Sequence, residues 1–358
     1  MTPFLLDHNL REREYTHKEI DKDFKHAILN KYGTNYYLKS KKKIIIFSTQ
    51  LDTEIDEMGI YFLSQNIDYD RINSEDIVQG NFSFSISYNQ KGTKVVLKDK
   101  RLDIKYDLDS YDYIWFRHFS IHCDNDKIPP YEKEYSEQEW MSLFSSIPML
   151  FKNKVFMPAY SDGFLTKPYQ LKIANEVGLS IIPTFISNNF TEINSFTQKN
   201  NTNIVKAIYH HMFFTDSNNL VEFNTKNFTY LNNKERKSVS QVPAIYQPNY
   251  LTSNSKEIRV TVFGKRMVAY CYDNYFGKDW HPQLRKLHVT KVNIPIDVKN
   301  SILNFFKVAH ITFGTVDFII KDDKWYFLEI NVNGDWAWLE NLANTSFSHL
   351  LIATLLEG

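Results

Sequence analysis

Residues 314–338, GTVDFIIKDDKWYFLEINVNGDWAW, carry the densest group of chemically capable side chains in this 358-residue chain. Two stretches rich in apolar residues, Gly314–Ile320 and Trp325–Ile330, are separated by the polar tetrad 321–324. Apolar runs joined by a short polar turn are typical of a β-hairpin. The segment therefore predicts two antiparallel strands near the end of the chain.

The predicted hairpin places three oxygen-bearing side chains on one face. Asp317 and Glu329 would lie near each other across the two strands, and the period of two along a strand puts Asn331 on the face of Glu329. Carboxylate and amide oxygens suit Mg²⁺, whose remaining positions phosphate oxygens and water can fill. We therefore predict a metal site on Asp317, Glu329 and Asn331. A solvated acidic hairpin would explain the same residues equally well.

Three cationic side chains precede this hairpin. Lys167 stands at the start of a predicted helix, Lys206 ends a short apolar strand, and Arg259 lies in the strand KEIRVTVFG. The arginine fork binds two oxygens and stays charged, which suits a triphosphate. Each lysine taken alone is more often a solvated surface residue, and Glu257 either contacts a nucleotide or pairs with a lysine.

Residues 246–250 (YQPNY) form an apolar-polar link of the kind that passes between two lobes and offers backbone groups to a purine. Its candidate nucleotide contacts are Gln247, Asn249 and Tyr250.

The secondary-structure elements that must position these residues predict an α/β fold. Ile44–Phe47, a helix-like stretch 51–65 and a strand 67–72 form a βαβ unit, which predicts a parallel sheet. Arg117 and His118 follow a further buried strand, where a solvated surface pair is the favoured interpretation. Further along, Thr166–Gly178 is predicted as a helix that Gly178 ends in the left-handed conformation. Other predicted elements are a hairpin at 82–97, helices at 18–32, 131–150, 298–309 and 346–356, and strands at 203–207, 259–262 and 267–271.

Bulk composition narrows the classes of function. Lys+Arg and Asp+Glu are equal at 42 each, so no overall charge favours nucleic acid or an anionic membrane. The two cysteines cannot form a disulfide framework. The charged N-terminus does not resemble a signal peptide, and no apolar run reaches the ~18 residues that a membrane helix needs. We therefore expect a cytoplasmic protein with neither nucleic-acid nor membrane partners.

The sequence resembles the ATP-grasp superfamily in the order of its motifs. Two lysines come first, followed by the 246–250 link, the E-I-R-V strand and then D…E-x-N. Within it the chain looks closest to the peptide maturases that make graspetides, the microviridin-type group that includes grasp-with-spasm systems. The narrower resemblance is carried by Trp115–Arg117, residues 165–174 with Gly178-Leu179, and residues 329–336.

The resemblance implies an ATP-grasp fold, α/β with α+β lobes, in five parts. These are an N-terminal extension (1–40), a parallel-sheet pre-ATP-grasp domain (41–130), a helical connection (131–165), a central lobe that docks a leader peptide (166–246) and a C-terminal lobe with the magnesium site (247–358). It implies ATP and Mg²⁺ as cofactors and a precursor peptide as partner, and a homodimer is left open.

By the same resemblance, an Asp or Glu side chain of the precursor is phosphorylated and then closed to an ω-ester or ω-amide by Ser/Thr or Lys. Lys206 and Arg259 would act in catalysis, and the nucleotide would be held by Lys167, Lys206, Gln247, Asn249, Tyr250, Glu257, Arg259 and Asn331. The family motif has proline where Val332 stands, and its D-[FW]-R arginine is replaced here by His281. Either His281 itself or Arg285, four residues later, is the expected substitute near the reacting phosphate.

Two other functions remain open on the sequence. One is a ligase that adds amino acids to a peptide or protein, or joins small molecules, through the same acyl phosphate. The other is a non-catalytic ATP-binding scaffold that recruits a peptide, which the missing arginine favours.

Overall fold

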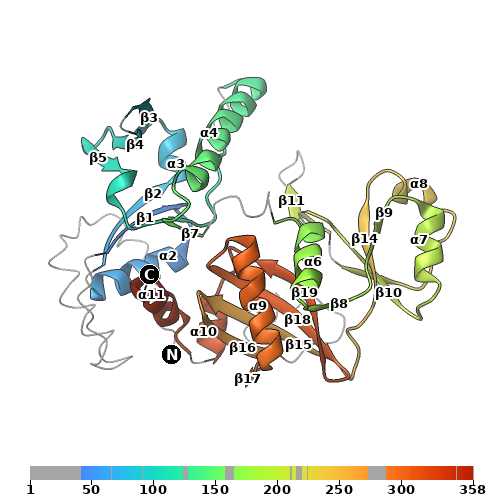
Figure 1. Cartoon of the computed structure of the whole chain (residues 1–358). Coiled ribbons are helices and arrows are strands. Elements are labelled where there is room, and N and C mark those ends of the chain that lie inside the picture. The colour runs from blue at the N-terminus through green and yellow to red at the C-terminus, as the bar shows by residue number, and fades with distance from the viewer. Residues whose placement is uncertain are drawn as a thin grey trace. The chain divides into compact units, whose positions relative to one another are not determined.

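The computed structural model describes residues 42–357 except 66, 91, 124–127, 158–164, 210–211, 215–219, 224, 273–287 and 344. The predicted N-terminal extension and its helix at 18–32 lie outside these residues. The chain divides into two compact units, one holding the described residues up to Val155 together with those from Leu351, the other Phe156–Leu350 (Figure 1). The finer division into five parts stays a prediction.

The first unit contains the predicted parallel sheet. Strands β1 (Lys43–Ser48), β2 (Asp68–Asn73) and β6 (Tyr113–Phe116) lie in the order β2-β1-β6, and β1 is parallel to both β2 and β6. The sheet continues from β6 to β7 (Val155–Met157), which starts at the last residue of this stretch of the unit. Helix α2 (Thr53–Ser64) connects β1 to β2. The side chains of Ile44–Phe47 are fully buried, as expected for a strand covered on both faces. The predicted βαβ unit is therefore confirmed.

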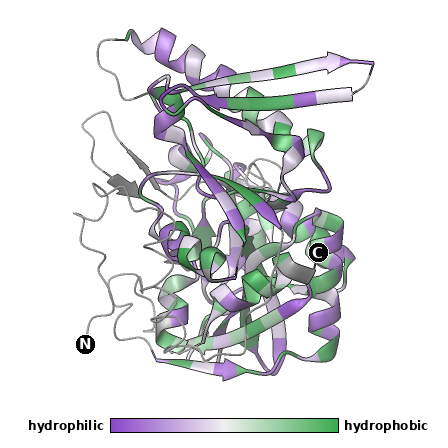
Figure 2. Cartoon of the chain, turned by 90° about the vertical axis from the view of Figure 1, so that its left-hand side faces the viewer, coloured by the Kyte–Doolittle hydropathy of each residue, from purple (hydrophilic) through white to green (hydrophobic). Residues whose placement is uncertain are grey.

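A second, antiparallel sheet in this unit joins β3 (Phe82–Asn89), β4 (Gly92–Asp99) and β5 (Ile104–Asp107). The predicted hairpin at 82–97 is confirmed by the β3–β4 pairing. Hydrophobic residues alternate with more hydrophilic ones along β3 of this hairpin, whose hydropathy Figure 2 shows by colour. Helix α4 spans Pro130–Leu150. The remaining helical segments are α3 (Ser74–Val78) and η2 (Leu108–Ser110).

The expectation of a solvated Arg117 was wrong. Its side chain is 1% exposed and pairs with Asp52, at 3.1 Å from Nε to Oδ2, and with Glu54. Asp52 in turn caps helix α2 by accepting from the Ile55 backbone N–H, and it accepts from the Ser48 hydroxyl. A buried guanidinium requires such partners. The pairing joins residues more than sixty positions apart, which a local pattern does not indicate.

The side chain of Tyr111, which follows η2, bonds to strand β2, because its hydroxyl donates to Asp70 Oδ2 at 2.7 Å. Burial, and then Asp70, raise the pKa of Tyr111 far above its usual value. A raised folded-state pKa gives stability that is fully present below the unfolded pKa of about 10 and is lost as pH rises further. We therefore expect Tyr111→Phe to lower the free energy of unfolding by about 1 kcal/mol near neutral pH.

That difference should shrink above about pH 10, because only the wild type then loses stability through Tyr111. Urea unfolding of both proteins across the alkaline range measures it. Tyr88→Phe, at an exposed position of β3, is the matched control. A difference that stays constant through the alkaline range would contradict the prediction.

The second unit is built on a six-stranded sheet in the order β17-β16-β15-β18-β19-β8. Helices α6 (Lys167–Glu176) and α9 (Ile296–Ala309) cover one face of it in Figure 1. Leu171 and Ile173 of α6 and Phe305 of α9 pack with the apolar residues of the strands in one buried cluster. The strand bounds are β8 Ser180–Ile181, β15 Lys256–Phe263, β16 Arg266–Tyr272, β17 Val289–Val292, β18 Phe313–Lys321 and β19 Lys324–Asn331.

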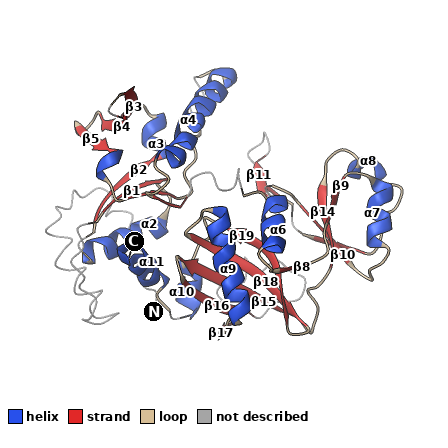
Figure 3. Ribbon diagram, viewed as in Figure 1, coloured by secondary structure: helices blue, strands red, loops and turns tan. Residues whose placement is uncertain are grey.

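A four-stranded antiparallel sheet, β13-β10-β14-β9, belongs to the same unit (Figure 3). Its strands are β9 (Phe185–Ser187), β10 (Asn203–Lys206), β13 (Lys226–Phe228) and β14 (Ala244–Pro248). The unit also contains the pair β11 (Met212–Phe214) and β12 (Leu220–Glu222), and helices α7 (Phe190–Thr197), α8 (Arg236–Val239) and α10 (Ala337–Ala343); α11 (Phe347–Glu357) ends the chain. In the parts of the chain that the structure describes, no helix is long and apolar enough to cross a membrane.

Candidate functional site

The predicted C-terminal hairpin is confirmed. Strands β18 and β19 pair antiparallel, and Asp322 and Asp323 form the turn with φ of +50° and +58°. Left-handed backbone at both turn residues matches the twist of the flanking strands, and Asp tolerates it. Asp317 stands directly opposite Glu329 in this pairing, and the register shifts just after Asp317.

Polar side chains occupy the face of the sheet opposite the apolar cluster. Arg259 on β15 pairs in register with Asp317 on β18, and Thr315 pairs with Asn331. The residues between them, including Val260 and Val316, belong to the buried cluster that packs on α6 and α9. Strand alternation thus gathers residues from three strands into one polar site.

Arg259 and Asp317 form a two-pronged ion pair. Nε lies 3.0 Å from Oδ1 and Nη2 lies 3.3 Å from Oδ2. The Asn331 amide donates to the same Oδ2 at 3.2 Å, and the Trp338 ring lies 5.4 Å from the guanidinium carbon. These contacts hold the Asp317 carboxylate in one orientation.

The surroundings of Asp317 fit a bound cation. Burial raises the pKa of this carboxyl, while Arg259 acts to lower it and Glu329 to raise it further. A divalent cation between two neighbouring carboxylates would relieve both burial and repulsion. Among the described residues no three His, Cys, Asp or Glu side chains gather as a metal site, so this one would need Asn331 and phosphate or water oxygens.

Two lysines face the other carboxylate. Lys167 Nζ lies 3.2 Å from Glu329 Oε2 and donates to the Ala207 carbonyl. Burial lowers the pKa of Lys206, and the charges of Glu329, Lys167, Glu257 and Asp317 also act on it. Burial acts to raise the pKa of Glu329, but Lys167 and Lys206 hold it below its usual value. Both lysines therefore belong to the same electrostatic site as the carboxylates.

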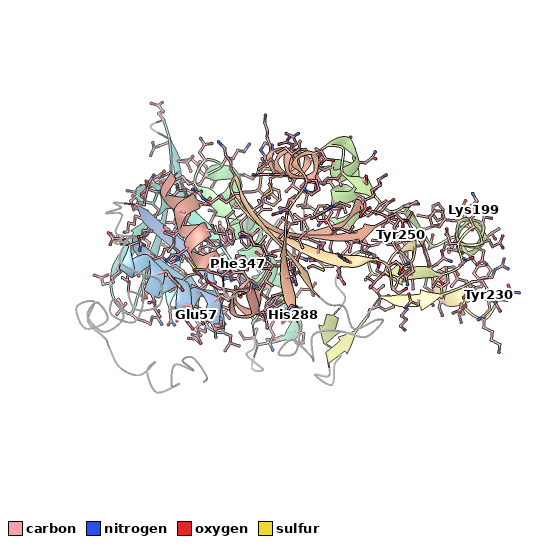
Figure 4. All side chains as sticks on the ribbon, turned by 90° about the horizontal axis from the view of Figure 1, so that it is seen from below. Glu57, Lys199, Tyr230, Tyr250, His288 and Phe347 are labelled. Atoms are coloured by element: carbon pink, nitrogen blue, oxygen red, sulfur yellow. The ribbon has the colours of Figure 1, made fainter. Side chains whose placement is uncertain are left out.

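The three candidate nucleotide contacts in the 246–250 link differ in their surroundings. Gln247 is buried; its amide nitrogen donates to Thr184 Oγ1 at 2.7 Å, and its Oε1 has no hydrogen-bond partner within the described chain. Asn249 and Tyr250 instead have protein partners, Asn249 donating to Asn227 and Tyr250 packing on Tyr326 with ring centroids 4.9 Å apart. Figure 4 labels Tyr250 beside the strands of the six-stranded sheet. A nucleotide role for all three stays a prediction.

Two candidate catalytic residues, His281 and Arg285, lie outside the described residues, as does the whole segment 273–287. Their predicted role near the reacting phosphate remains a prediction.

Sequence reasoning missed two residues that support the site. The buried Gln170 side chain bonds the backbone of β19 between Glu329 and Asn331. At Gly334, a Cβ would lie 2.4 Å from Thr315 Oγ1, so only glycine fits without a shift. Gly334 lies in the motif 329–336, so its type was a readable signal, whereas a glutamine within a helical pattern did not indicate the buried position of Gln170.

We expect Gly334→Ala to destabilise the protein by about 1–3 kcal/mol, because the added methyl overpacks the site behind Asn331. Chemical denaturation measures the loss. Adding Thr315→Ala removes the nearest atom and should recover part of it. Equal stability of Gly334→Ala and wild type would show that the contact relaxes freely.

Comparisons with known proteins give structural matches alone. No protein-family model matches the sequence, and no curated protein matches it. A Chryseobacterium gregarium RiPP-associated ATP-grasp ligase, in complex with ADP and a leader and core peptide, matches with a TM-score of 0.73 and 22% identity over 88% of this chain and 97% of that one. The macrocyclase MdnC from Microcystis aeruginosa, bound with precursor peptide MdnA, matches with a TM-score of 0.73 and 19% identity over 88% and 98%.

The ATP-grasp ligase PsnB, complexed with minimal precursor, Mg and ADP, matches with a TM-score of 0.67 and 16% identity over 87% of this chain and 97% of that one. Similarity at this level of identity concerns the fold. The chain has the ATP-grasp fold, α/β with an N-terminal parallel sheet and further antiparallel sheets, as the resemblance implied.

Proposed function

We propose that this protein is an ATP-dependent, magnesium-requiring ligase that activates Asp or Glu side chains of a ribosomally made precursor peptide and closes ω-ester or ω-amide crosslinks. The observation that carries the proposal is the cross-strand pair Asp317–Glu329, in which Arg259 is ion-paired to Asp317, Lys167 is ion-paired to Glu329 and the charge of Lys206 acts on Glu329. Structures with the same fold, described as a RiPP-associated ligase and a macrocyclase with their peptides, support the substrate class.

Asp317, Glu329 and Asn331 would hold Mg²⁺. When bound, the ion would neutralise charge on the transferring phosphoryl group. PsnB, described in complex with Mg and ADP, supports this assignment. Phosphoryl transfer depends on positioning and charge neutralisation more than on covalent chemistry. Arg259 would act on both the metal ligand and the phosphates. It orients the Asp317 carboxylate, and its guanidinium stays charged at all working pH values.

The nucleotide would lie against Lys167, Lys206 and Arg259, with Glu257, Asn331 and the linker residues Gln247, Asn249 and Tyr250 completing the contacts. Gln247 supports a contact with adenine. Its Oε1 is buried and has no partner among the described residues, so it could accept from the adenine amino group. Arg285 or His281 would approach the reacting phosphate.

The reaction balances in two steps. A peptide carboxylate oxygen bonds to the γ-phosphorus as its bond to ADP breaks, giving an acyl phosphate. A Ser/Thr hydroxyl or Lys amine of the same peptide then bonds to the acyl carbon, the carbon–oxygen bond to phosphate breaks, and the nucleophile's proton is released. ATP and the linear peptide thus become ADP, phosphate and a ring that has lost the elements of water.

Incubation of the protein with ATP, Mg²⁺ and a peptide carrying acidic residues and Ser, Thr or Lys, with and without added free amino acids, tests the proposal. We expect one ADP and the loss of one water in mass for each crosslink. A mass increase by an added amino acid would support the amino-acid ligase instead. Nucleotide and peptide binding without ADP formation would support the non-catalytic scaffold.

A further inference from the structure

We infer that Gln170, on helix α6, is a positioning residue that sets the placement of the magnesium ligands on β19; the inference rests on the proposed function. The Gln170 side chain is buried, its oxygen accepts from the Ile330 backbone N–H at 2.9 Å, and its nitrogen donates to the Ile330 carbonyl at 3.1 Å. Ile330 stands between Glu329 and Asn331, the two predicted ligands on this strand.

The amide takes the place of a missing strand. On the side of β19 away from β18, strand β8 pairs only with Tyr326 and Phe327. In an antiparallel ladder the N–H and C=O of one residue point to the same side, and the sides alternate along the strand. The Ile330 groups that bond Gln170 therefore point away from β18. Without Gln170, a buried donor and acceptor would lose their partners at that point.

Gln170 also ties this strand to the lysine. Its nitrogen donates to the Leu165 carbonyl at 2.8 Å, just ahead of the helix. Lys167 begins the same helix one turn before Gln170 and reaches Glu329. One side chain thus fixes the start of α6 and the backbone of β19, and with them the separation of a cation and the metal ligands.

A packing role alone would not need an amide. Burying an amide costs free energy unless its hydrogen bonds are made, and a methionine of similar length would fill the space without them. Groups that orient metal ligands affect metal affinity, commonly by about 10- to 100-fold when replaced. Loss of Gln170 should therefore weaken Mg²⁺ binding selectively.

Calorimetry on the full chain with Mg²⁺ and ADP as probes tests this. For Gln170→Met we expect the affinity for Mg²⁺ at saturating ADP to fall about 10- to 100-fold, with a much smaller change in the affinity for ADP in EDTA. Lys172→Met, at an exposed position of the same helix, is the matched control and should match the wild type in both titrations.

Mg²⁺ affinity at the wild-type level in Gln170→Met, or a parallel loss of ADP affinity in EDTA, would overturn the inference. Absence of Mg²⁺-dependent ADP binding in the wild type would instead overturn the proposed function, and the inference with it. If Gln170→Met shows no cooperative unfolding transition, Gln170→Glu carries the test. It keeps the acceptor for the Ile330 N–H, loses both donated bonds, and should show the same selective loss.

Discussion

Asp317→Asn is expected to lower peptide-dependent ADP formation by about 10³-fold, because it removes one of the two carboxylates that would hold Mg²⁺. The substitution keeps the shape of the side chain and its place opposite Glu329. It removes the negative charge that Arg259 and a cation share. The rate of ADP release at saturating ATP and peptide, with Mg²⁺ at a concentration that saturates the wild type, measures the effect.

Asp323→Asn is the control for Asp317→Asn, since it makes the same chemical change at the turn of the same hairpin. Its rate should remain near that of the wild type. Excess Mg²⁺ should restore part of the activity of Asp317→Asn if weakened metal binding is the cause. Full activity of Asp317→Asn at limiting Mg²⁺ would remove Asp317 from the metal site.

Arg259→Met is expected to reduce both stability and activity. It leaves the Asp317 carboxylate buried without its cation, which we expect to cost about 3 kcal/mol in the free energy of unfolding of the metal-free protein. The lost charge at the phosphates should lower kcat/KM for ATP by about 10²- to 10³-fold. Denaturant unfolding in EDTA and steady-state kinetics measure the two effects separately.

The double variant Arg259→Met/Asp317→Asn separates the two roles. With no charge left to desolvate, its stability loss should be smaller than the sum of the single losses, whereas its activity should not recover. Arg236→Met is the control. It removes an arginine of α8 that lies over the Phe190 ring of α7, and it should change neither quantity by much. Additive stability losses in the double variant would show that the ion pair contributes little.

The parts of this protein that could be read from its sequence are those set by local pattern. Apolar strands around the tetrad 321–324 predicted the β18–β19 hairpin, and the period of two placed Asp317 and Glu329 on its polar face. Helix α6 likewise begins at Lys167 and is followed by Gly178 at φ +86°, as its capping pattern predicted.

The features that sequence reasoning missed depend on contacts between distant segments. Arg117 was expected in solvent, but Asp52 and Glu54 lie more than sixty residues earlier and make its burial stable. Gln170 bonds a strand 160 residues later. A polar residue on a helix indicates solvent by default, and no local pattern marks the unpaired backbone edge that it satisfies.

The central claim, activation of a peptide carboxylate by ATP, is tested most directly by oxygen transfer. A precursor peptide is labelled with ¹⁸O in its Asp and Glu side chains, incubated with the protein, ATP and Mg²⁺, and the released phosphate is analysed by mass spectrometry. We predict one labelled oxygen in phosphate for each crosslink formed, because the acyl phosphate releases the carboxylate oxygen with its phosphoryl group. ADP formation with unlabelled phosphate would contradict the account, since water rather than the peptide would then be the acceptor.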